Sequence, residues 1–445
     1  MCHMPKGLRK IEVSFEEPHL THFAGMCLIQ WFCQKLGLRR LPQRHLRPGP
    51  RYREYHPADM ILAILYAIIA GMDRVNETQI LQYNGAFQKL VGLHRFPDQT
   101  AIRRFLKRLT PQHIRQIVRV HDLMRHRRFD RPHPRTSLVF DLDSTVLAVY
   151  GRLVEGARVG YNPKKRGRRS YHPLLAFESR FPEFWHGSLR PGDAGASTGA
   201  VPFLKVCLAK VPPHLPRSRL RFRLDAGFYS RRTVEFLDGE RYGYVIVAKG
   251  YNPIKVRAQA CQFTRLRNGW EVGEFQFQPP KWTQPRRFVV VRRPIPTDPV
   301  EAKQLTLFKD KKYVYHVLVT NLRTSAWRVY RFYGLRARIE KHIRELVYDY
   351  PLAKIPTQDW LPNVAFFQLL LFASDLVHYF KRLCLPRRYR YKTLKTIRME
   401  LLVLPGQLVR SKKQYRLKLP AYYHFEDAFL KAMAEIQKLK LPARA

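Results

Sequence analysis

Acidic residues are scarce in this sequence. The chain of 445 residues carries 34 Asp and Glu against 81 Lys and Arg, a formal net charge of +47. Such an excess opposes folding by self-repulsion and calls for a polyanionic partner. Nucleic acid is the partner we expect, through salt-sensitive phosphate contacts. An anionic membrane surface is a weaker alternative, because the charge is spread along the chain and is not confined to one amphipathic helix.

Paired cysteine motifs are absent. No two of the six cysteines form a Cys-x-x-Cys motif, which argues against a zinc ribbon and a dithiol redox site. Scattered cysteines fit a reduced cytosolic protein best. The six are Cys2, Cys27, Cys33, Cys207, Cys261 and Cys384.

Apolar runs long enough for a membrane are also missing. The longest, 60–71 and 364–373, fall short of the roughly 20 residues that a membrane span needs, so we interpret them as buried helices and expect no membrane partner. The N-terminus has no signal-peptide pattern. With 45 % hydrophobic residues, the chain has the composition of a globular protein of several domains.

Residues 1–130 form a helical N-terminal region in this prediction. Pro57 and Asp59 begin one helix and Gly71 ends it. Asp98 to Thr100 could cap another helix. Two interpretations are about equally supported: a helix-turn-helix-like unit for DNA binding or dimerisation, and a helical bundle with a solvated basic face. The basic side chains on that face are Arg103, Arg104, Lys107 and Arg108.

The middle of the chain has the alternation typical of strands. Residues 131–250 are predicted to run β-β-β-α-β-α-β, the order of a ribonuclease-H-like α/β fold with a mixed sheet. A β-rich insertion, 251–325, then interrupts this catalytic core. The core resumes over 326–385 with two helices, and 386–445 is a C-terminal region with strands and a last amphipathic helix.

Three carboxylates are placed to meet. Asp141 and Asp143 share one face of a hydrophobic strand. Asp225 ends the fourth core strand, before Gly227, which permits a close turn. In a ribonuclease-H-like sheet the first and fourth strands are neighbours, so Asp143 and Asp225 would lie side by side. The helix that carries Glu340 can pack across that edge.

The stretch 330–350 is predicted as one helix with a mixed face. Tyr333, Arg336, Glu340 and Arg344 fall within roughly 80° of one another on a helical projection. That face is either a surface salt-bridge ladder or a metal ligand, Glu340, beside which Tyr333, Arg336 and Arg344 contact DNA phosphates.

The three acids, Asp143, Asp225 and Glu340, favour two hard cations, Mg²⁺ or Mn²⁺, as cofactors. A lone acid at a strand end is more often a turn former, but three in this order on so basic a chain reverse that preference. Asp141 is equally well explained as a ligand or as a supporting partner. A basic loop, either solvated or facing DNA, carries Lys164, Lys165, Arg166, Arg168 and Arg169.

At these residues the chain resembles the DDE transposases of bacterial insertion sequences. Its "DLDST" (141–145) matches a first motif Asp-x-Asp-Ser-Thr, and "RLDAGF" (223–228) matches a second, with Ala226 in place of Ser. The third motif, Tyr-x-x-Arg-x-x-x-Glu, is matched by Tyr333, Arg336 and Glu340. Val347 stands where that motif has a Lys.

The resemblance implies a DNA transposase. Asp143, Asp225 and Glu340 would be its catalytic triad with two Mg²⁺ ions, and a homodimer would pair terminal inverted repeats before joining 3′-hydroxyls to target DNA. It implies that the insertion helps hold a hairpin and a flipped base, for which Trp270 and Trp282 are stacking candidates, although core packing suits either one better. The alternatives are a nuclease without strand transfer and a catalytically silent, domesticated DNA-binding protein. We expect a cytoplasmic, nucleoid-associated bacterial protein.

Overall fold

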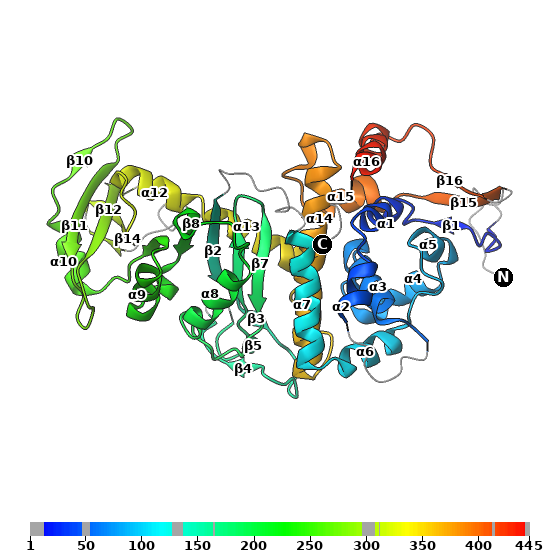
Figure 1. Ribbon diagram of the computed structural model, residues 1–445, viewed down its shortest axis with the longest axis horizontal. Coiled ribbons are helices and arrows are strands. Elements are labelled where there is room, and N and C mark those ends of the chain that lie inside the picture. The colour runs from blue at the N-terminus through cyan, green and yellow to red at the C-terminus, as the bar shows by residue number, and fades with distance from the viewer. Residues whose placement is uncertain are drawn as a thin grey trace, which may run out of the picture. The chain divides into compact units, whose positions relative to one another are not determined.

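The computed structural model describes residues 13–46, 54–126, 137–162, 165–295, 308–310, 312–411 and 414–440 (Figure 1). Its contacts divide the chain into two units. The first, which we call the helical unit, joins residues up to Arg108 with those from Tyr379 onward. The second, the sheet unit, runs from Leu109 to His378.

The helical unit is built around an almost wholly buried helix, α3 (Pro57–Ala70). Pro57 occupies its first turn, and Gly71 ends it at φ 100°, the left-handed conformation that glycine adopts without strain. The predicted start and stop of this helix are therefore confirmed. The unit's other helices before residue 109 are α1 (Met26–Lys35), α2 (Arg40–His45), α4 (Gln79–Gln82), α5 (Gly85–Leu90) and α6 (Gln99–Arg108).

Helix α6 begins as the sequence predicts. The carboxylate of Asp98 accepts hydrogen bonds from the backbone N–H groups of Thr100 and Ala101, at 2.7 and 2.8 Å. Its apolar side is buried, and the basic side chains predicted on its outer face, Arg103 and Arg104 among them, are exposed. Whether this face contacts DNA stays a prediction.

The C-terminal region folds with the N-terminal helices. Arg398 donates from Nε and Nη2 to the carbonyls of Ile69 and Ile68, both at 2.7 Å, and so caps the end of α3. A three-stranded sheet in the order β1-β15-β16 adds to the same unit. The elements concerned are β1 (Leu20–Thr21), α15 (Leu394–Ile397), β15 (Gly406–Ser411), β16 (Gln414–Lys418) and α16 (Glu426–Lys438).

Helix α7 (Pro111–His126) belongs to the sheet unit, so the predicted boundary at residue 130 lies too far along the chain. Two buried contacts of α7 explain this. His121 pairs with Asp375 at 2.7 Å, and Arg125 donates to the carbonyl of Trp185 at 2.6 Å. Both partners come from later parts of the chain, which a local sequence pattern does not show.

A ten-stranded mixed sheet forms the centre of the sheet unit. At one end its order is β7-β6-β2-β8-β9, with β2, β8 and β9 parallel to one another and β6 antiparallel to β2. The first and fourth predicted strands are thus neighbours. These strands are β2 (Leu138–Ser144), β6 (Leu174–Glu178), β7 (Glu183–Ser188), β8 (Leu220–Leu224) and β9 (Gly243–Val247).

The strands described within residues 251–325 extend this sheet. β14 pairs with β9 through Leu318 and Val247, and the sheet then continues through β12 and β11 to β10. Hydrophobic alternation predicts strands here but does not predict their partners. The elements are α10 (Asn252–Gln259), β10 (Thr264–Arg265), β11 (Glu271–Phe277), β12 (Arg286–Pro294), β13 (Phe308–Lys309) and β14 (Tyr313–Thr320).

Part of the predicted basic loop is itself ordered into a small sheet. β3 (Leu147–Ala148), β4 (Arg158–Val159) and β5 (Arg169–Tyr171) pair in the order β3-β5-β4. In the sequence this small sheet lies between β2 and β6. The chain therefore enters it just after Asp143 and leaves it for β6, where Leu175 pairs with Asp143.

Helices cover both faces of the large sheet. One apolar cluster joins the sheet to α8 (Ala200–Ala209) and α9 (Arg231–Gly239), through Phe203, Leu204 and Val234. A second cluster, on the other face, holds Val329 and Tyr333 of α12 (Ala326–Gly334). Because side chains alternate along a strand, Phe140 and Leu142 face the first layer while Asp141 and Asp143 face the opposite side of the sheet.

Helix α14 (Trp360–Leu383) is a core helix. It is the one described helix long and apolar enough to cross a membrane, yet 83 % of its apolar window is buried inside the protein. Burial of this kind confirms the interpretation of 364–373 as part of a packed helix. Gln368 of α14 donates to the carbonyl of Gly187 at 2.8 Å, which ties the helix to β7.

Gly187 allows α14 to approach β7 closely. A Cβ added at this position would lie 2.4 Å from Leu371 Cδ1 and 2.9 Å from Phe367. We expect Gly187→Ala to lower the free energy of unfolding by about 1–3 kcal/mol, the usual cost of overpacking a filled core. Gly239→Ala, at a position with open space around it, should change little in the same urea titration. Equal stability of the two variants would contradict this packing.

Candidate active site

The end of β2 presents two aspartates to the face that α12 covers. Asp143 accepts a hydrogen bond from the N–H of Ser144 at 2.8 Å through Oδ1. His172 holds this turn from the side, because its Nε2 lies 3.0 Å from Ser144 Oγ and its Nδ1 lies 2.6 Å from the carbonyl of Ala194. His172 is therefore a positioning residue.

Asp225 follows β8 directly and is held by its own turn. Its Oδ1 accepts a hydrogen bond from the N–H of Gly227 at 2.8 Å, while its Oδ2 lies 3.7 Å from Arg336 Nη2. A Cβ at Gly227 would lie 2.9 Å from that Oδ1 and 2.8 Å from Ala196 Cβ, so a larger residue would displace the carboxylate. Because β2 and β8 are parallel neighbours with Leu142 beside Leu224, the two aspartates leave the sheet at the same edge.

The predicted single helix over 330–350 is two helices. α12 ends at Gly334, and α13 (Ala337–Tyr348) begins after Arg336. Glycine has a low helix propensity, which favours a break at this point. The break turns Arg336 away from solvent, and its Nη2 donates to the carbonyl of Leu142 at 3.1 Å. The helical projection that placed Arg336 on an outer face fails for this reason.

Arg336 lies among all three predicted carboxylates. Its Nη2 is 3.2 Å from Asp143 Oδ1 and 3.7 Å from Asp225 Oδ2, and its Nη1 is 3.6 Å from Glu340 Oε1. The two aspartate oxygens that share Nη2 are thus no more than about 7 Å apart. Side-chain exposure rises from 5 % for Arg336 through 15 % for Asp143 and 36 % for Asp225 to 61 % for Glu340, so the site opens to solvent on the Glu340 side.

Burial and like charge dominate the electrostatics here. Burial raises the pKa of Asp143 to about 6, even though the Arg336 guanidinium acts to lower it, and Asp225 and Glu340 add to the increase. Burial would lower the pKa of Arg336, but Asp143, Tyr333 and Asp225 raise it above its ordinary value. A carboxylate that resists ionisation beside two other acids is a group that gains from an added cation.

Asp141 is engaged by another arginine. Its two oxygens accept from Arg223 Nε and Nη2 at 2.6 and 2.7 Å, and both side chains are almost completely buried. Arg223 also donates to the carbonyl of Phe332 at 2.9 Å, which joins β8 to α12. Of the two interpretations left open for Asp141, this geometry favours the supporting partner over the metal ligand.

Three other predicted DNA contacts lie in different surroundings. Tyr333 is buried in the α12 cluster, at 3 % exposure, and its pKa is raised by burial, so it presents no surface to DNA and the prediction for it is wrong. Arg336, 4 % exposed, is likewise inside the site. Arg344 is exposed on α13 and lies over the Tyr348 ring.

The predicted residues of the basic loop and the two tryptophans differ in their exposure to solvent. Lys165, Arg166 and Arg168 are exposed, Arg169 is half-buried, and Lys164 lies outside the described residues. Trp282 is 8 % exposed and packs 5.4 Å from the Tyr229 ring, so its surroundings contradict base stacking. Trp270 is partly exposed beside the rings of Trp327 and Tyr330.

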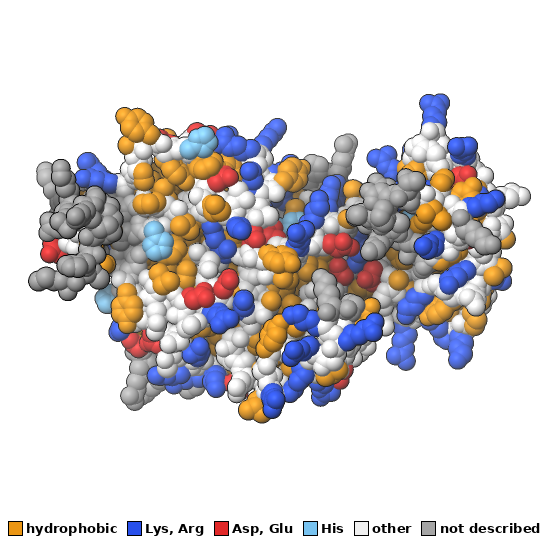
Figure 2. Space-filling view, turned by 180° about the vertical axis from the view of Figure 1, so that it is seen from behind, with side chains coloured by type: hydrophobic (Ala, Val, Ile, Leu, Met, Phe, Trp, Pro, Cys, Tyr) orange, Lys and Arg blue, Asp and Glu red, His pale blue; other side chains and the backbone are white. Residues whose placement is uncertain are grey.

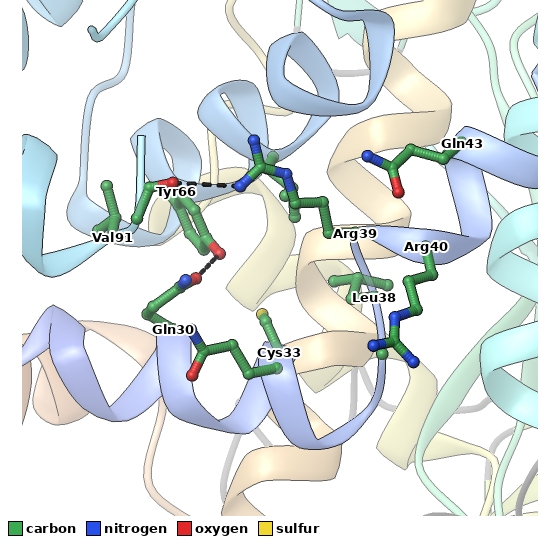
Figure 3. Close-up of a pocket in the computed structure, with 12 residues that line it drawn as sticks. Gln30, Cys33, Leu38, Arg39, Arg40, Gln43, Tyr66 and Val91 are labelled. Atoms are coloured by element: carbon green, nitrogen blue, oxygen red, sulfur yellow. Dashed lines mark hydrogen bonds between the residues drawn. The ribbon is translucent and has the colours of Figure 1, made fainter. Parts of the chain in front are cut away.

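A separate cavity of about 360 Å³ lies in the helical unit (Figure 3). Tyr66 donates to Gln30 there, and Arg39 reaches the carbonyl of Gly92 at 3.3 Å and Asp59 at 2.8 Å. No acidic side chain is among the described residues that line it. The chemistry of this protein is therefore to be sought at the carboxylates of the sheet unit.

Comparison with known families supports that choice. The family described as Transposase DDE domain group 1 matches residues 4–441, nearly the whole chain. The chain belongs to this family. Its matched span includes Asp143, Asp225 and Glu340.

Solved structures give weaker likenesses to this DDE-domain protein. A piggyBac transposase synaptic complex with hairpin DNA aligns at 13 % identity over 99 % of this chain and 88 % of that chain, with a TM-score of 0.42. A Mos1 transposase paired-end complex aligns at 12 % identity over 44 % and 60 %, with a TM-score of 0.18. No curated protein matches the chain. At these TM-scores neither likeness carries an argument about function.

The carboxylate site fits divalent metal. Asp143, Asp225 and Glu340 offer oxygen ligands from three elements, and hard cations such as Mg²⁺ prefer oxygen. The raised pKa of Asp143 has the same implication, because a divalent ion would favour its ionised form. The family makes metal-dependent DNA chemistry the natural use of such a site.

The raised pKa of Asp143 predicts that ionising this residue lowers the stability of the folded protein. The folded protein holds this proton more tightly than the unfolded chain, so stability falls as pH rises from about 4 through 6. In metal-free buffer we expect Asp143→Asn to be more stable than the wild type by about 1–3 kcal/mol at pH 8, with the difference vanishing toward pH 4. Urea unfolding at both pH values measures it.

The matched control is Asp193→Asn, which removes an exposed acid paired with Arg158. Exposed pairs contribute little, so this variant should follow the wild type at both pH values. A destabilised Asp143→Asn protein at pH 8 would show that Asp143 serves chiefly as the counter-ion of Arg336.

Proposed function

We propose that this protein is a DNA transposase of a bacterial insertion sequence, which cuts transposon ends and joins their 3′-hydroxyls to target DNA. The observation that carries the proposal is the convergence of Asp143, Asp225 and Glu340 around one guanidinium in a chain of the DDE family. The strand order β7-β6-β2-β8-β9, with the second strand antiparallel, supports a ribonuclease-H-like core.

In this proposal the three carboxylates hold two Mg²⁺ or Mn²⁺ ions. When bound, such ions activate a water or a 3′-hydroxyl and stabilise the leaving oxygen of a phosphodiester. The chain's own part is to present the oxygens. The Gly227 N–H orients Asp225, the Ser144 turn orients Asp143, and Glu340 reaches in from the exposed side of α13.

Arg336 has a second part in the same proposal. Its fixed positive charge lies within 4 Å of each carboxylate and limits their mutual repulsion. The same guanidinium is a suitable donor to a phosphate oxygen that enters the site. Its role is therefore assigned inside the centre and not on an outer DNA-binding face.

Binding of DNA follows from charge. The net charge of +47 is spread over the surface, and Figure 2 shows many more Lys and Arg side chains than acidic ones on the face in view. Exposed residues of the basic loop, such as Arg166 and Arg168, and those of α6, Arg103 and Arg104, are our candidates for phosphate contacts. Trp270 stays a candidate for stacking on a base.

One further part of the proposal rests on the chemistry of transposition alone. A homodimer is expected on DNA, because two ends must be paired before both are cut.

Two alternatives to a transposase differ in what they would do. A nuclease without strand transfer would use the same carboxylates and differs only in its products. A domesticated binding protein has no need for the three acids and is the less favoured alternative.

Cleavage tests the catalytic assignment. With Mg²⁺ and a duplex bearing the element's own terminal repeat, wild-type protein should nick at the repeat boundary. Asp225→Asn and Glu340→Gln should lose at least about 100-fold in rate, because each removes a carboxylate from the metal centre. Denaturing gels resolve nicked, cut and joined products, and a gel-shift assay shows whether binding is kept.

Glu240→Gln is the matched control, because Glu240 is an exposed acid of the sheet unit that pairs with Arg217 and belongs to neither cluster of acids. Equal cleavage by wild type and Glu340→Gln would point to a contaminating nuclease. Nicks without joined products would favour the nuclease, and end-specific binding without nicks would favour the binding protein.

Salt dependence tests the basic loop. Replacing Lys165, Arg166 and Arg168 with Ala should weaken DNA binding about equally for all sequences. It should also reduce the slope of log K against log salt by about 2–3, since each phosphate contact contributes roughly 0.9. Fluorescence anisotropy from about 50 to about 300 mM salt measures this.

The control is the same change to Ala at three exposed cations of the C-terminal helix and its end, Lys431, Lys438 and Lys440. Equal slopes for the two variants would exclude the loop from the DNA interface.

A further inference from the structure

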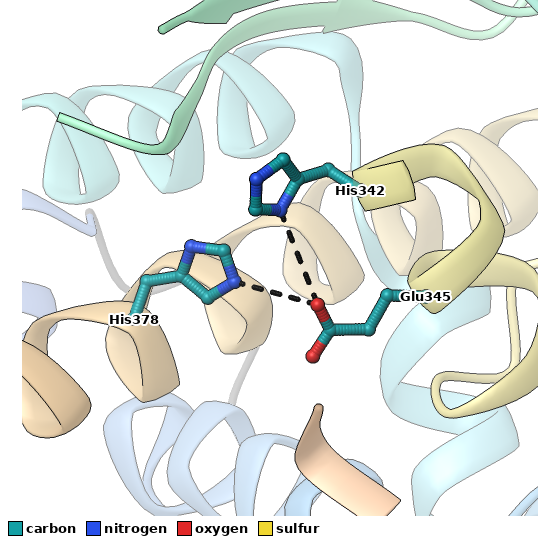
Figure 4. Close-up of side chains that lie close together, drawn as sticks. All are labelled: His342, Glu345 and His378. Carbon is teal, nitrogen blue, oxygen red and sulfur yellow. Dashed lines mark ion pairs between the residues drawn. The ribbon is translucent and has the colours of Figure 1, made fainter. Parts of the chain in front are cut away.

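A second cluster of ligand-type side chains lies on the far side of α13 from Glu340. His342 and Glu345 of α13 meet His378 of α14, and one ligand atom from each lies within 4.8 Å of the others (Figure 4). All three belong to the sheet unit. The cluster is sheltered, with side-chain exposures of 20 % for His342, 9 % for Glu345 and 5 % for His378.

The distances within this cluster are too long for hydrogen bonds. Glu345 Oε2 lies 3.7 Å from His378 Nε2 and 4.0 Å from His342 Nδ1. A charge-assisted N–H···O bond would be about 2.7–2.9 Å long. Two ligands at about 2.0–2.1 Å from one tetrahedral ion are roughly 3.3 Å apart, so small side-chain rotations would close the three atoms around a metal.

His378 is oriented as metal-binding histidines are. Its Nδ1 lies 2.6 Å from the carbonyl of Pro182, which fixes the proton on Nδ1 and leaves the Nε2 lone pair directed toward Glu345. This Nε2 is buried and has no hydrogen-bond partner within the described part of the chain. A buried imidazole nitrogen without a donor is an unsatisfied acceptor, and a cation would satisfy it.

We propose that His342, Glu345 and His378 form a binding site for one divalent transition-metal ion, Zn²⁺ in the first place. Two imidazole nitrogens and one carboxylate are ligands that zinc binds well and that Mg²⁺ does not favour. The site is chemically distinct from the all-oxygen centre on the other side of the helix. It does not depend on the proposed DNA chemistry.

The position of this site gives it a structural role. On a helical projection His342 and Glu345 lie about 200° and 140° from Glu340, so the ion binds the face opposite the catalytic one. A shared ion links α13, which follows the break at Arg336, to the buried helix α14. The link fixes the rotation of α13 and with it the direction of Glu340.

Metal analysis of the protein, purified without a histidine tag, tests the proposal. We expect about one zinc ion per wild-type chain after dialysis, unaffected by excess Mg²⁺. Cobalt substituted for zinc should give the visible absorption of a site with nitrogen ligands. His378→Gln and His342→Gln should each lower zinc affinity at least about 100-fold, since each loses a direct ligand.

Two histidine controls separate ligand loss from loss of folding. His214→Gln changes an exposed histidine outside the cluster, and His121→Gln changes a buried one that pairs with Asp375. Both should keep the zinc and the rise in melting temperature that zinc produces, even though His121→Gln starts from a lower melting temperature. His342→Gln should lose that rise while it stays folded.

Three results would overturn the proposal. One is wild-type protein with no zinc above background and no cobalt spectrum at stoichiometric ion. Another is equal zinc binding by wild type and both cluster variants. The third is a hydrogen bond between protonated His378 and Glu345 that persists, by NMR of the imidazole, with zinc present. Each of them is measured without a cleavage assay, so a failure of this proposal is distinguishable from a failure of the proposed function.

Discussion

The guanidinium of Arg336 is the contact on which the rest of the site depends. Three acids lie within 4 Å of it, and one of them, Asp143, is buried enough for its pKa to reach about 6. Without a cation at this point the ionised carboxylates would repel one another. The charge is placed there by the break between α12 and α13, so a backbone feature determines the electrostatics of the centre.

The supporting structure is arranged around that charge. Asp141 and Arg223 form a buried pair directly behind Asp143, and Arg223 reaches on to the carbonyl of Phe332. Such a pair adds little net stability, but removing one partner leaves a buried charge uncompensated and destabilises the fold strongly. The pair therefore enforces one arrangement of β2, β8 and α12. The aspartates are thus held by the sheet, while Glu340 comes from a helix that other contacts must orient.

Much of this could be predicted from the sequence, and for identifiable reasons. Alternation along β2 and the acid after β8 predict where Asp143 and Asp225 leave the sheet, because strand periodicity is local information. The break at Gly334 is not predicted, because the helical spacing of Tyr333, Arg336 and Glu340 continues across that glycine. The pairing of β14 with β9 and the meeting of His378 with α13 join residues far apart in the chain, and neither has a local pattern that would have revealed it.

Helix α13 carries residues of both sites, so its orientation affects both of them. Glu340 is the most exposed of the three acids and sits in the first turn of α13, just after the break, where a helix is least constrained by its own hydrogen bonds. A carboxylate in that position needs its helix fixed from another side. Ile339 and Leu346 do this by packing, and the ion that we propose between His342, Glu345 and His378 would tie α13 to α14. In the proposed arrangement, α13 presents Glu340 to the carboxylate site on one face and binds an ion through His342 and Glu345 on the other, so the exposed Glu340 is held without being buried.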